Sequence, residues 1–222
     1  MGKRKLALAV TLTAVLAGCG KMPGTGASAR INGSIHVTAG SPAASAATVN
    51  GSIVADDDAT LTTARTINGG ISIGARTSAE SLTTVNGAVK LGPGARVSGG
   101  ITVVNGAITL ADGAQVGGAI KNVNGAISLN AAQVSGGITT VDGNVTVSGA
   151  SRVEGGITVK RPSGAFFHVS DAVPRIVIGP GAVVDGTLRF EHQVALYVSD
   201  SAKIGPVQGA TPTPFSGPTP PD

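Results

Sequence analysis

The sequence has very few aromatic residues and only one cysteine. Of its 222 residues, four are Phe, one is Tyr and none is Trp, and charged residues make up only 13%. A compact globular core normally uses more aromatic side chains to fill its volume. A single cysteine excludes an internal disulfide, so the fold must be stable without one. Disorder does not fit either, because Val, Ile and Leu are abundant and regularly placed.

Residues that commonly carry metal or catalytic chemistry are also scarce. The three histidines, at positions 36, 168 and 192, are not at metal-ligand spacing, and no H-E-x-x-H motif or cysteine cluster occurs. Residues 70–74 match G-x-S-x-G, but that motif requires a strand-to-helix elbow and here it lies inside a repeat. Residues 56–58 are three aspartates, which we expect to form a solvated turn. The sequence therefore predicts no enzyme, no catalytic residue, no metal site and no cofactor.

The first 19 residues, MGKRKLALAVTLTAVLAGC, have the layout of a bacterial export signal. Cations at positions 3–5 precede an apolar run over residues 6–16, which is too short to span a bilayer. The run ends in Leu-Ala-Gly-Cys, which resembles the lipobox of bacterial lipoproteins. This resemblance implies that residues 1–18 are a signal peptide and that the thiol of Cys19 carries lipid. Ordinary secretion with an unmodified Cys19 is the alternative.

The lipobox resemblance also implies a location in the bacterial cell envelope. The residue after Cys19 is Gly20 rather than Asp, which by the sorting rule of enteric bacteria favours the outer membrane, facing the periplasm. An anchor with several acyl chains holds a protein stably on a membrane, whereas a single chain is marginal. The predicted membrane contact is therefore through lipid, and residues 19–29 form a short tether.

Removal of the signal peptide changes the charge balance of the chain. The full sequence has 16 Lys and Arg against 12 Asp and Glu, and three of the cations lie within residues 1–18, which leaves 13 against 12. The basic character thus comes largely from the export signal. It does not indicate a nucleic-acid partner, which would require a basic patch on the mature domain.

A repeat of 18 or 19 residues dominates the sequence. Val or Ile followed by Asn-Gly recurs six times, and a seventh copy has Asp in place of Asn. The polar residues of these copies are Asn32, Asn50, Asn68, Asn86, Asn105, Asn124 and Asp142. Within each period, apolar and polar residues alternate in short runs interrupted by Asp-Gly or Gly-Gly. Such runs are typical of strands with one buried face, and a fixed period of this kind is typical of a solenoid.

Stacking the periods aligns the apolar residues in columns. Two columns begin at Ile35 and Val37, and two more begin at Val97 and Ile101. A parallel β-helix buries such columns, because each strand pairs with the coils above and below it. We predict an all-β fold, a single-stranded parallel β-helix of either hand with about nine coils. Its regular part spans residues 30–159 and its terminal coils span residues 176–207.

The Asn-Gly pair allows two interpretations. Between alternating runs it is the strongest short signal for a two-residue hairpin, which would give an antiparallel meander. In a β-helix the same pair turns a corner, where Gly accepts a positive φ and the stacked Asn side chains form an amide ladder. We favour the β-helix, because only one strongly apolar residue precedes each pair and the half-repeats differ in length. Asp142 suits the end of the ladder, because stacked carboxylates would repel.

The repeat is interrupted in the C-terminal third. Residues 160–175, KRPSGAFFHVSDAVPR, are expected to be a loop inserted between two coils. We favour a role for this loop in covering the open end of the solenoid, and the alternative is a partner contact through Phe166, Phe167 and His168. Residues 208–222 are rich in Pro and Thr, and we expect a disordered, extended tail there.

Some coils resemble known β-helical families. The pattern I-G-P-G-A-x-V-x-G at residues 178–186, and nearly at 91–99, resembles the coils of bactofilins, the polymer-forming cytoskeletal proteins, and those of left-handed hexapeptide-repeat acyltransferases. The VNG copies also resemble repeats of bacterial β-strand-repeat envelope proteins. The bactofilin resemblance implies a β-helix that associates end to end. Bactofilins are typically cytoplasmic or bind the inner membrane from that side, so the lipobox departs from their pattern.

These features predict a lipid-anchored structural or scaffold protein of the cell envelope, with self-association into homo-oligomers through the ends of the β-helix. The alternative is a module that binds envelope polysaccharide or protein through residues 160–200. An enzyme is the least favoured of the three. No nucleic-acid partner is expected.

Overall fold

The computed structural model describes residues 27–162 and 173–221. This part of the chain contains 27 strands and no helix. The strands form three sheets, which we call A, B and C, with ten, ten and seven strands. Every strand pairing in the described residues is parallel, as in β11 with β14 and β12 with β15. The meander alternative is therefore wrong, since hairpins pair consecutive strands in antiparallel fashion.

The strands are short, as the interrupted apolar runs of the sequence predict. Sheet A contains β1 (Ala27–Asn32), β3 (Ala44–Asn50), β5 (Leu61–Asn68), β8 (Ser81–Asn86), β11 (Ile101–Asn105), β14 (Ile120–Asn124), β17 (Ile138–Thr140), β20 (Ile157–Val159), β23 (Leu188–Phe190) and β26 (Val207–Gln208). Sheet B contains β2 (Ile35–Val37), β4 (Ile53–Ala55), β6 (Ile71–Ile73), β9 (Val89–Leu91), β12 (Ile108–Leu110), β15 (Ile127–Asn130), β18 (Val145–Ser148), β21 (Arg175–Ile178), β24 (Ala195–Ser199) and β27 (Thr213–Phe215). Sheet C contains β7 (Ser78–Ala79), β10 (Arg96–Val97), β13 (Gln115–Val116), β16 (Gln133–Val134), β19 (Arg152–Val153), β22 (Val183–Val184) and β25 (Lys203–Ile204).

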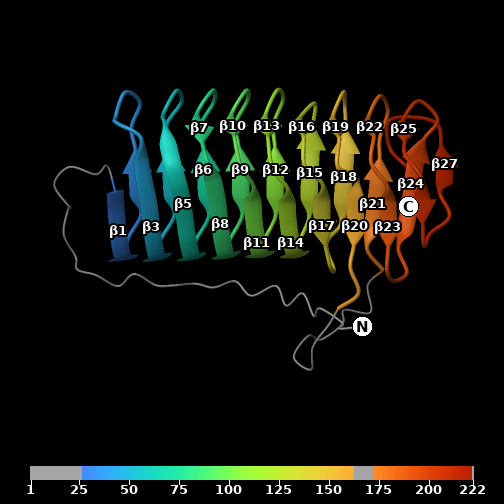
Figure 1. Ribbon diagram of the computed structural model, residues 1–222, viewed down its shortest axis with the longest axis horizontal. Helices are drawn as coiled ribbons and strands as arrows, with labels where there is room; N and C mark the ends of the chain where they lie inside the picture. The colour runs from blue at the N-terminus through green and yellow to red at the C-terminus, as the bar shows by residue number, and fades with distance from the viewer. Residues whose placement is uncertain (1–26, 163–172, 222) are drawn as a thin grey trace, which may run out of the picture.

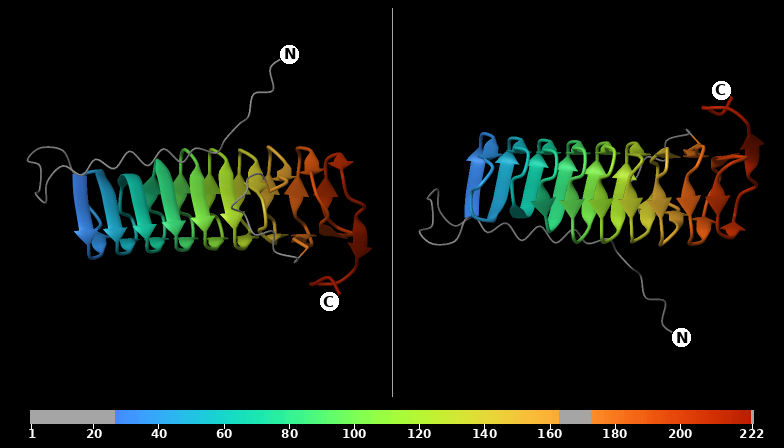
Figure 2. Two further views of the ribbon diagram at one scale, coloured as in Figure 1. Left: turned by 90° about the horizontal axis from the view of Figure 1, so that it is seen from below. Right: turned by 90° about the horizontal axis from the view of Figure 1, so that it is seen from above.

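Each coil visits the sheets in the order A, B, C. The ten strands of sheets A and B define ten coils, which stack in chain order from β1 to β27 (Figure 1). Seen from below and from above, the strands form the same stack, in order from the blue N-terminal coils to the red C-terminal ones (Figure 2). The chain is therefore a parallel β-solenoid, as the repeat predicts, with one coil more than the nine expected.

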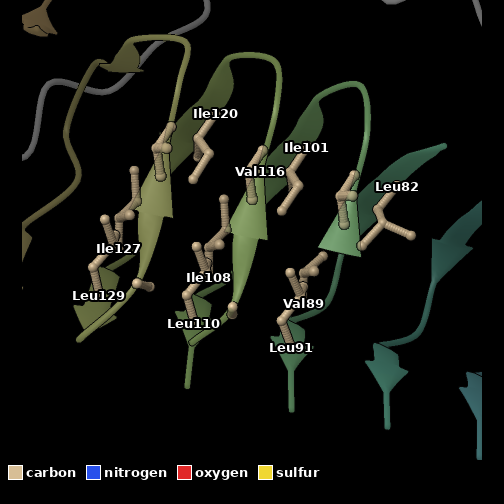
Figure 3. Close-up of a cluster of buried hydrophobic side chains, with 14 of the residues drawn as sticks. Leu82, Val89, Leu91, Ile101, Ile108, Leu110, Val116, Ile120, Ile127 and Leu129 are labelled. Atoms are coloured by element: carbon tan, nitrogen blue, oxygen red, sulfur yellow. The ribbon is translucent and has the colours of Figure 1, made fainter. Parts of the chain in front are cut away.

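The core consists of the predicted apolar columns. In sheet B, Ile108 pairs with Val89 on one side and Ile127 on the other, and all three are buried. Ile101 and Ile120 of sheet A are in register and face these residues across the interior (Figure 3). The alternation of inward and outward residues along each short strand, which comes from the pleat, produces this arrangement. The columns beginning at Ile35, Val37, Val97 and Ile101 are all confirmed.

The tenth coil comes from the segment that the sequence predicts to be a tail. Strand β26 pairs with β23, and β27 pairs with β24. Phe215 at the end of β27 is only 6% exposed, and Pro214 lies on an edge strand, where its missing N–H is tolerated. The prediction of a disordered tail over 208–222 is therefore wrong for these residues. The sequence interpretation gave more weight to the Pro and Thr content of this segment than to its one large apolar residue, Phe215.

The insertion leaves the solenoid at its side. It connects β20 of sheet A to β21 of sheet B in the eighth coil, so its two ends lie at a corner rather than at the last coil. The final coil is instead formed by residues 207–215. The proposed contact residues Phe166, Phe167 and His168 lie outside the described residues, as do Cys19 and the signal peptide.

The first coils bury smaller side chains than the later ones. Ala46 and Ala64 occupy the column that continues with Leu82, Ile101 and Ile120. A larger aliphatic side chain at such a site adds roughly 1–2 kcal/mol of burial. We expect native-state hydrogen exchange to show the weakest protection in residues 31–66 and stronger protection in residues 101–140. Equal or better protection of residues 31–66 would contradict this prediction.

Candidate functional site

The corner between sheets A and B carries a ladder of asparagine side chains. Each Asn amide donates from Nδ2 to Oδ1 of the Asn one coil earlier, over distances of 2.9 to 3.1 Å. The ladder runs through Asn32, Asn50, Asn68, Asn86, Asn105 and Asn124. All six residues are exposed. An amide has both a donor and an acceptor, so one residue type can continue this chain from coil to coil.

The ladder ends at Asn124. The next copy has Asp142, and no hydrogen bond joins its carboxylate to Asn124 within the described part of the chain. A carboxylate has no N–H to donate, so it cannot continue a chain that runs from Nδ2 to Oδ1. The corner changes here as well, because the backbone N–H of Gly143 donates to Oγ1 of Thr140 (3.1 Å).

From the second coil onward, the glycine of each Asn-Gly pair is required by close approach between coils. A Cβ on Gly69 would collide with the carbonyl group of Gly51, and a Cβ on Gly87 would collide with the carbonyl group of Gly69. A positive φ, which the sequence interpretation assigned to this glycine, occurs at Gly33 (104°) and Gly125 (121°) but at neither Gly69 nor Gly87. Stacking of backbone on backbone is therefore the more general reason for glycine at this position of the repeat.

A column of threonines lies inside the same corner. Thr48, Thr66 and Thr84 are buried, and each donates from Oγ1 to the glycine carbonyl of the preceding coil (3.1, 2.9 and 2.9 Å). These hydrogen bonds supply a donor to glycine carbonyl oxygens that would otherwise lack one. The sequence analysis missed this column. Its signal was the Thr that precedes Val-Asn-Gly or Ile-Asn-Gly in three consecutive periods.

Substitution of Thr84 by Val is expected to reduce the free energy of unfolding by about 1–3 kcal/mol, because the carbonyl oxygen of Gly69 loses its partner while the volume of the side chain is kept. Val103 occupies the same column one coil later, in register with Thr84. The matched variant Val103→Thr places a hydroxyl in the same column, where a hydrogen bond to the carbonyl oxygen of Gly87 would offset most of the cost of burial, and it is expected to cost less than about 1 kcal/mol. Urea denaturation measures both, and equal losses would show that the hydrogen bond contributes nothing.

The base of the insertion is held by arginines. Arg161 donates from Nη2 to the backbone oxygen of Glu191 (3.1 Å) and from its backbone N–H to the Glu191 carboxylate (3.3 Å). Arg175 donates from its backbone N–H to Asn144 Oδ1 (2.8 Å), and its guanidinium lies 4.8 Å from the ring centre of Tyr197. These contacts fix both ends of the insertion to neighbouring coils, so the arginines have structural partners here.

The three carboxylates of the acidic turn at residues 56–58 all have partners within the protein. Asp56 lies 2.6 Å from Nε2 of His36, and Asp58 accepts two hydrogen bonds from the guanidinium of Arg76 (2.8 and 2.6 Å). The Arg76 hydrogen bonds lower the pKa of Asp58 below its ordinary value. Asp57 accepts from the backbone N–H of Ala75 (2.7 Å). The turn therefore joins the first three coils electrostatically.

The remaining sequence candidates lie apart from one another. Ser72 of the G-x-S-x-G match is on the outer face of β6, in register with Val54 and Lys90. A turn and the short strand β7 follow β6, where the motif would require a helix. His192 donates from Nε2 to the backbone oxygen of Val141 (3.0 Å). In residues 27–162 and 173–221, no group of three or more His, Cys, Asp and Glu side chains is close enough to hold a metal ion.

The described chain also lacks a helix that is long and apolar enough to cross a membrane. Comparisons with protein-family models, with curated proteins and with solved structures found no match.

Proposed function

We propose that this chain is a lipid-anchored structural protein of the bacterial cell envelope, in which the β-solenoid acts as a rigid rod. The observation that carries this proposal is the continuity of the stack. The pairing of strands in sheets A and B runs through all ten coils without a break at the insertion, where β18 pairs directly with β21. A rod of ten coils at about 4.8 Å spacing is roughly 43 Å long.

The two ends of the rod are poorly suited to end-to-end association. At the first coil, Ser28 and Arg30 occupy register positions that later coils fill with buried Ala46 and Thr48. An inward-pointing charge on an edge strand opposes pairing with another sheet. At the last coil, Pro214 removes one donor from the edge strand β27. We therefore favour a monomeric rod over a rod that self-associates through its ends. Neither Arg30 nor Pro214 affects contacts made by the sides of the rod.

Membrane fractionation with lipid labelling of the wild type and the Cys19→Ser variant tests the anchor. The wild type is expected to carry the label and to remain with the membrane fraction, whereas the variant is expected to lose both. A Gly20→Asp variant is a matched control that keeps the thiol, and under the enteric sorting rule it moves the labelled protein to the inner membrane. A soluble, unlabelled, cytoplasmic wild type would overturn the proposal.

A further inference from the structure

A shallow groove runs along the outer face of sheet C. It has a volume of about 760 Å³ and is lined by residues from Ala43 to Ser135, which belong to six successive coils. Five spacings of about 4.8 Å make the groove roughly 24 Å long. The volume is within the usual range for ligand sites, about 300–1,000 Å³. The length fits an extended chain better than a compact small molecule.

Two rows of outward side chains form the walls of this groove. Arg96, Gln115 and Gln133 are in register along one row. Glu80 and Ser98 belong to the other row, two residues further along each coil. All five side chains are exposed. The first row therefore presents one polar side chain per coil. The second row presents Glu80, Ser98 and Ser135, and the coil between Ser98 and Ser135 carries Gly117.

Hydrogen bonds along the first row orient its two amides. Arg96 donates from Nε to Oε1 of Gln115 (3.3 Å), and Gln133 donates from Nε2 to Oε1 of Glu154 (3.1 Å). These contacts use the acceptor of Gln115 and one donor of Gln133. Within the described residues, the Nε2 donors of Gln115 and the Oε1 acceptor of Gln133 make no hydrogen bond. The C-terminal end of the groove therefore offers both a donor and an acceptor to a ligand.

The charge of the groove and the hydrogen bonding of its backbone disfavour two classes of ligand, polyanions and added peptide strands. Glu80 and Arg96 are its only charged lining residues, so their charges cancel, whereas a polyanion such as nucleic acid needs several cations. An added peptide strand needs unpaired backbone groups. Here the N–H groups of Gln115 and Ser135 are bonded to the preceding coil, at 2.8 and 2.9 Å. An uncharged polymer that is recognised by its side groups fits both conditions.

We propose that the groove on sheet C binds an extended, uncharged glycan chain lying parallel to the solenoid axis. Sugar hydroxyl and acetamido groups both donate and accept hydrogen bonds, which matches the amides of Gln115 and Gln133 and the hydroxyl groups of Ser98 and Ser135. No aromatic side chain lines the groove, so each sugar contributes only a few weak contacts and affinity grows with chain length. The inference rests on the proposed envelope location, which brings the groove close to glycan. It places glycan binding on sheet C rather than in residues 160–200.

Fluorescence anisotropy with a labelled hexamer of N-acetylglucosamine tests this inference. The full chain is purified in a detergent without a sugar headgroup and titrated with the hexamer and with the corresponding dimer. The hexamer is expected to bind at least tenfold more tightly than the dimer. The double variant Gln115→Ala/Gln133→Ala is expected to weaken hexamer binding about tenfold, because two neutral hydrogen bonds are lost.

The matched control is Thr109→Ala/Ser128→Ala, which removes two outward side chains from the same two coils on sheet B. It is expected to change hexamer binding less than twofold. The inference is overturned if the wild type does not bind the hexamer at millimolar concentration, if hexamer and dimer bind equally, or if both double variants weaken binding equally. Because binding is measured on purified protein, a failure of the anchor in the fractionation experiment leaves this result readable.

Discussion

Substitution of Gly69 by Ala is expected to destabilise the solenoid by at least about 2 kcal/mol. The added Cβ would collide with the carbonyl carbon and oxygen of Gly51, which are backbone atoms of the preceding coil and cannot rotate away. The coils would have to separate locally, which also lengthens the neighbouring hydrogen bond from Gly51 N–H to the Asn68 oxygen (3.0 Å). Overpacking of a well-packed interior costs about 1–3 kcal/mol, and here backbone hydrogen bonds are lost in addition.

The adjacent glycine supplies the control. A Cβ on Gly70 would lie 3.2 Å from the nearest atom, the oxygen of Ala88, and the following coils carry alanine at this position as Ala88, Ala107 and Ala126. Gly70→Ala is therefore expected to change the free energy of unfolding by less than about 1 kcal/mol, with part of any loss offset by the stiffer unfolded chain. Urea denaturation midpoints, measured at an unchanged m-value, compare the two variants. Equal midpoints would show that the coils tolerate a side chain at the corner.

The inner columns could be read from the sequence because the pleat has a period of two and the coil has a nearly fixed length. Once Ile108 is assigned to the interior, the 18- and 19-residue spacings place Val89 and Ile127 above and below it. The Asn side chains follow the same rule, since a constant spacing aligns identical residues. Periodicity therefore determined the stacking register, the core and the corner ladder before any structural information.

Features that depend on a single coil could not be read in this way. Phe215 has no counterpart at the same spacing, so nothing in the repeat indicated that it would be buried beside Ser199. The insertion also lies at the corner that carries Asn-Gly in the first six coils, and only the pairing of β18 with β21 shows that the stack continues past it. The groove on sheet C was missed for a different reason. Its walls combine Gln, Arg, Glu and Ser, which share a position but not a residue type.

The unequal sizes of the core residues lead to the second large effect. Ile120→Ala is expected to cost about 2–5 kcal/mol, because Ile120 is fully buried and its removal leaves a cavity between Ile101 and Ile138. The substitution recreates in the sixth coil the residue that the second and third coils have naturally, at Ala46 and Ala64. Neighbouring coils then lose nearest-neighbour contact in the middle of the stack, where both sides depend on it.

Lys121 provides the matched control, because it is the next residue of β14 and points outward. Lys121→Ala is expected to change the free energy of unfolding by less than about 0.5 kcal/mol. Hydrogen exchange should show faster exchange in the fifth to seventh coils of Ile120→Ala, at amides such as those of Ile127 and Ile138, and unchanged exchange in Lys121→Ala. If Ile120→Ala speeds exchange only in the first three coils, stability is set by fraying from the N-terminal end, and the central columns contribute less than their burial indicates.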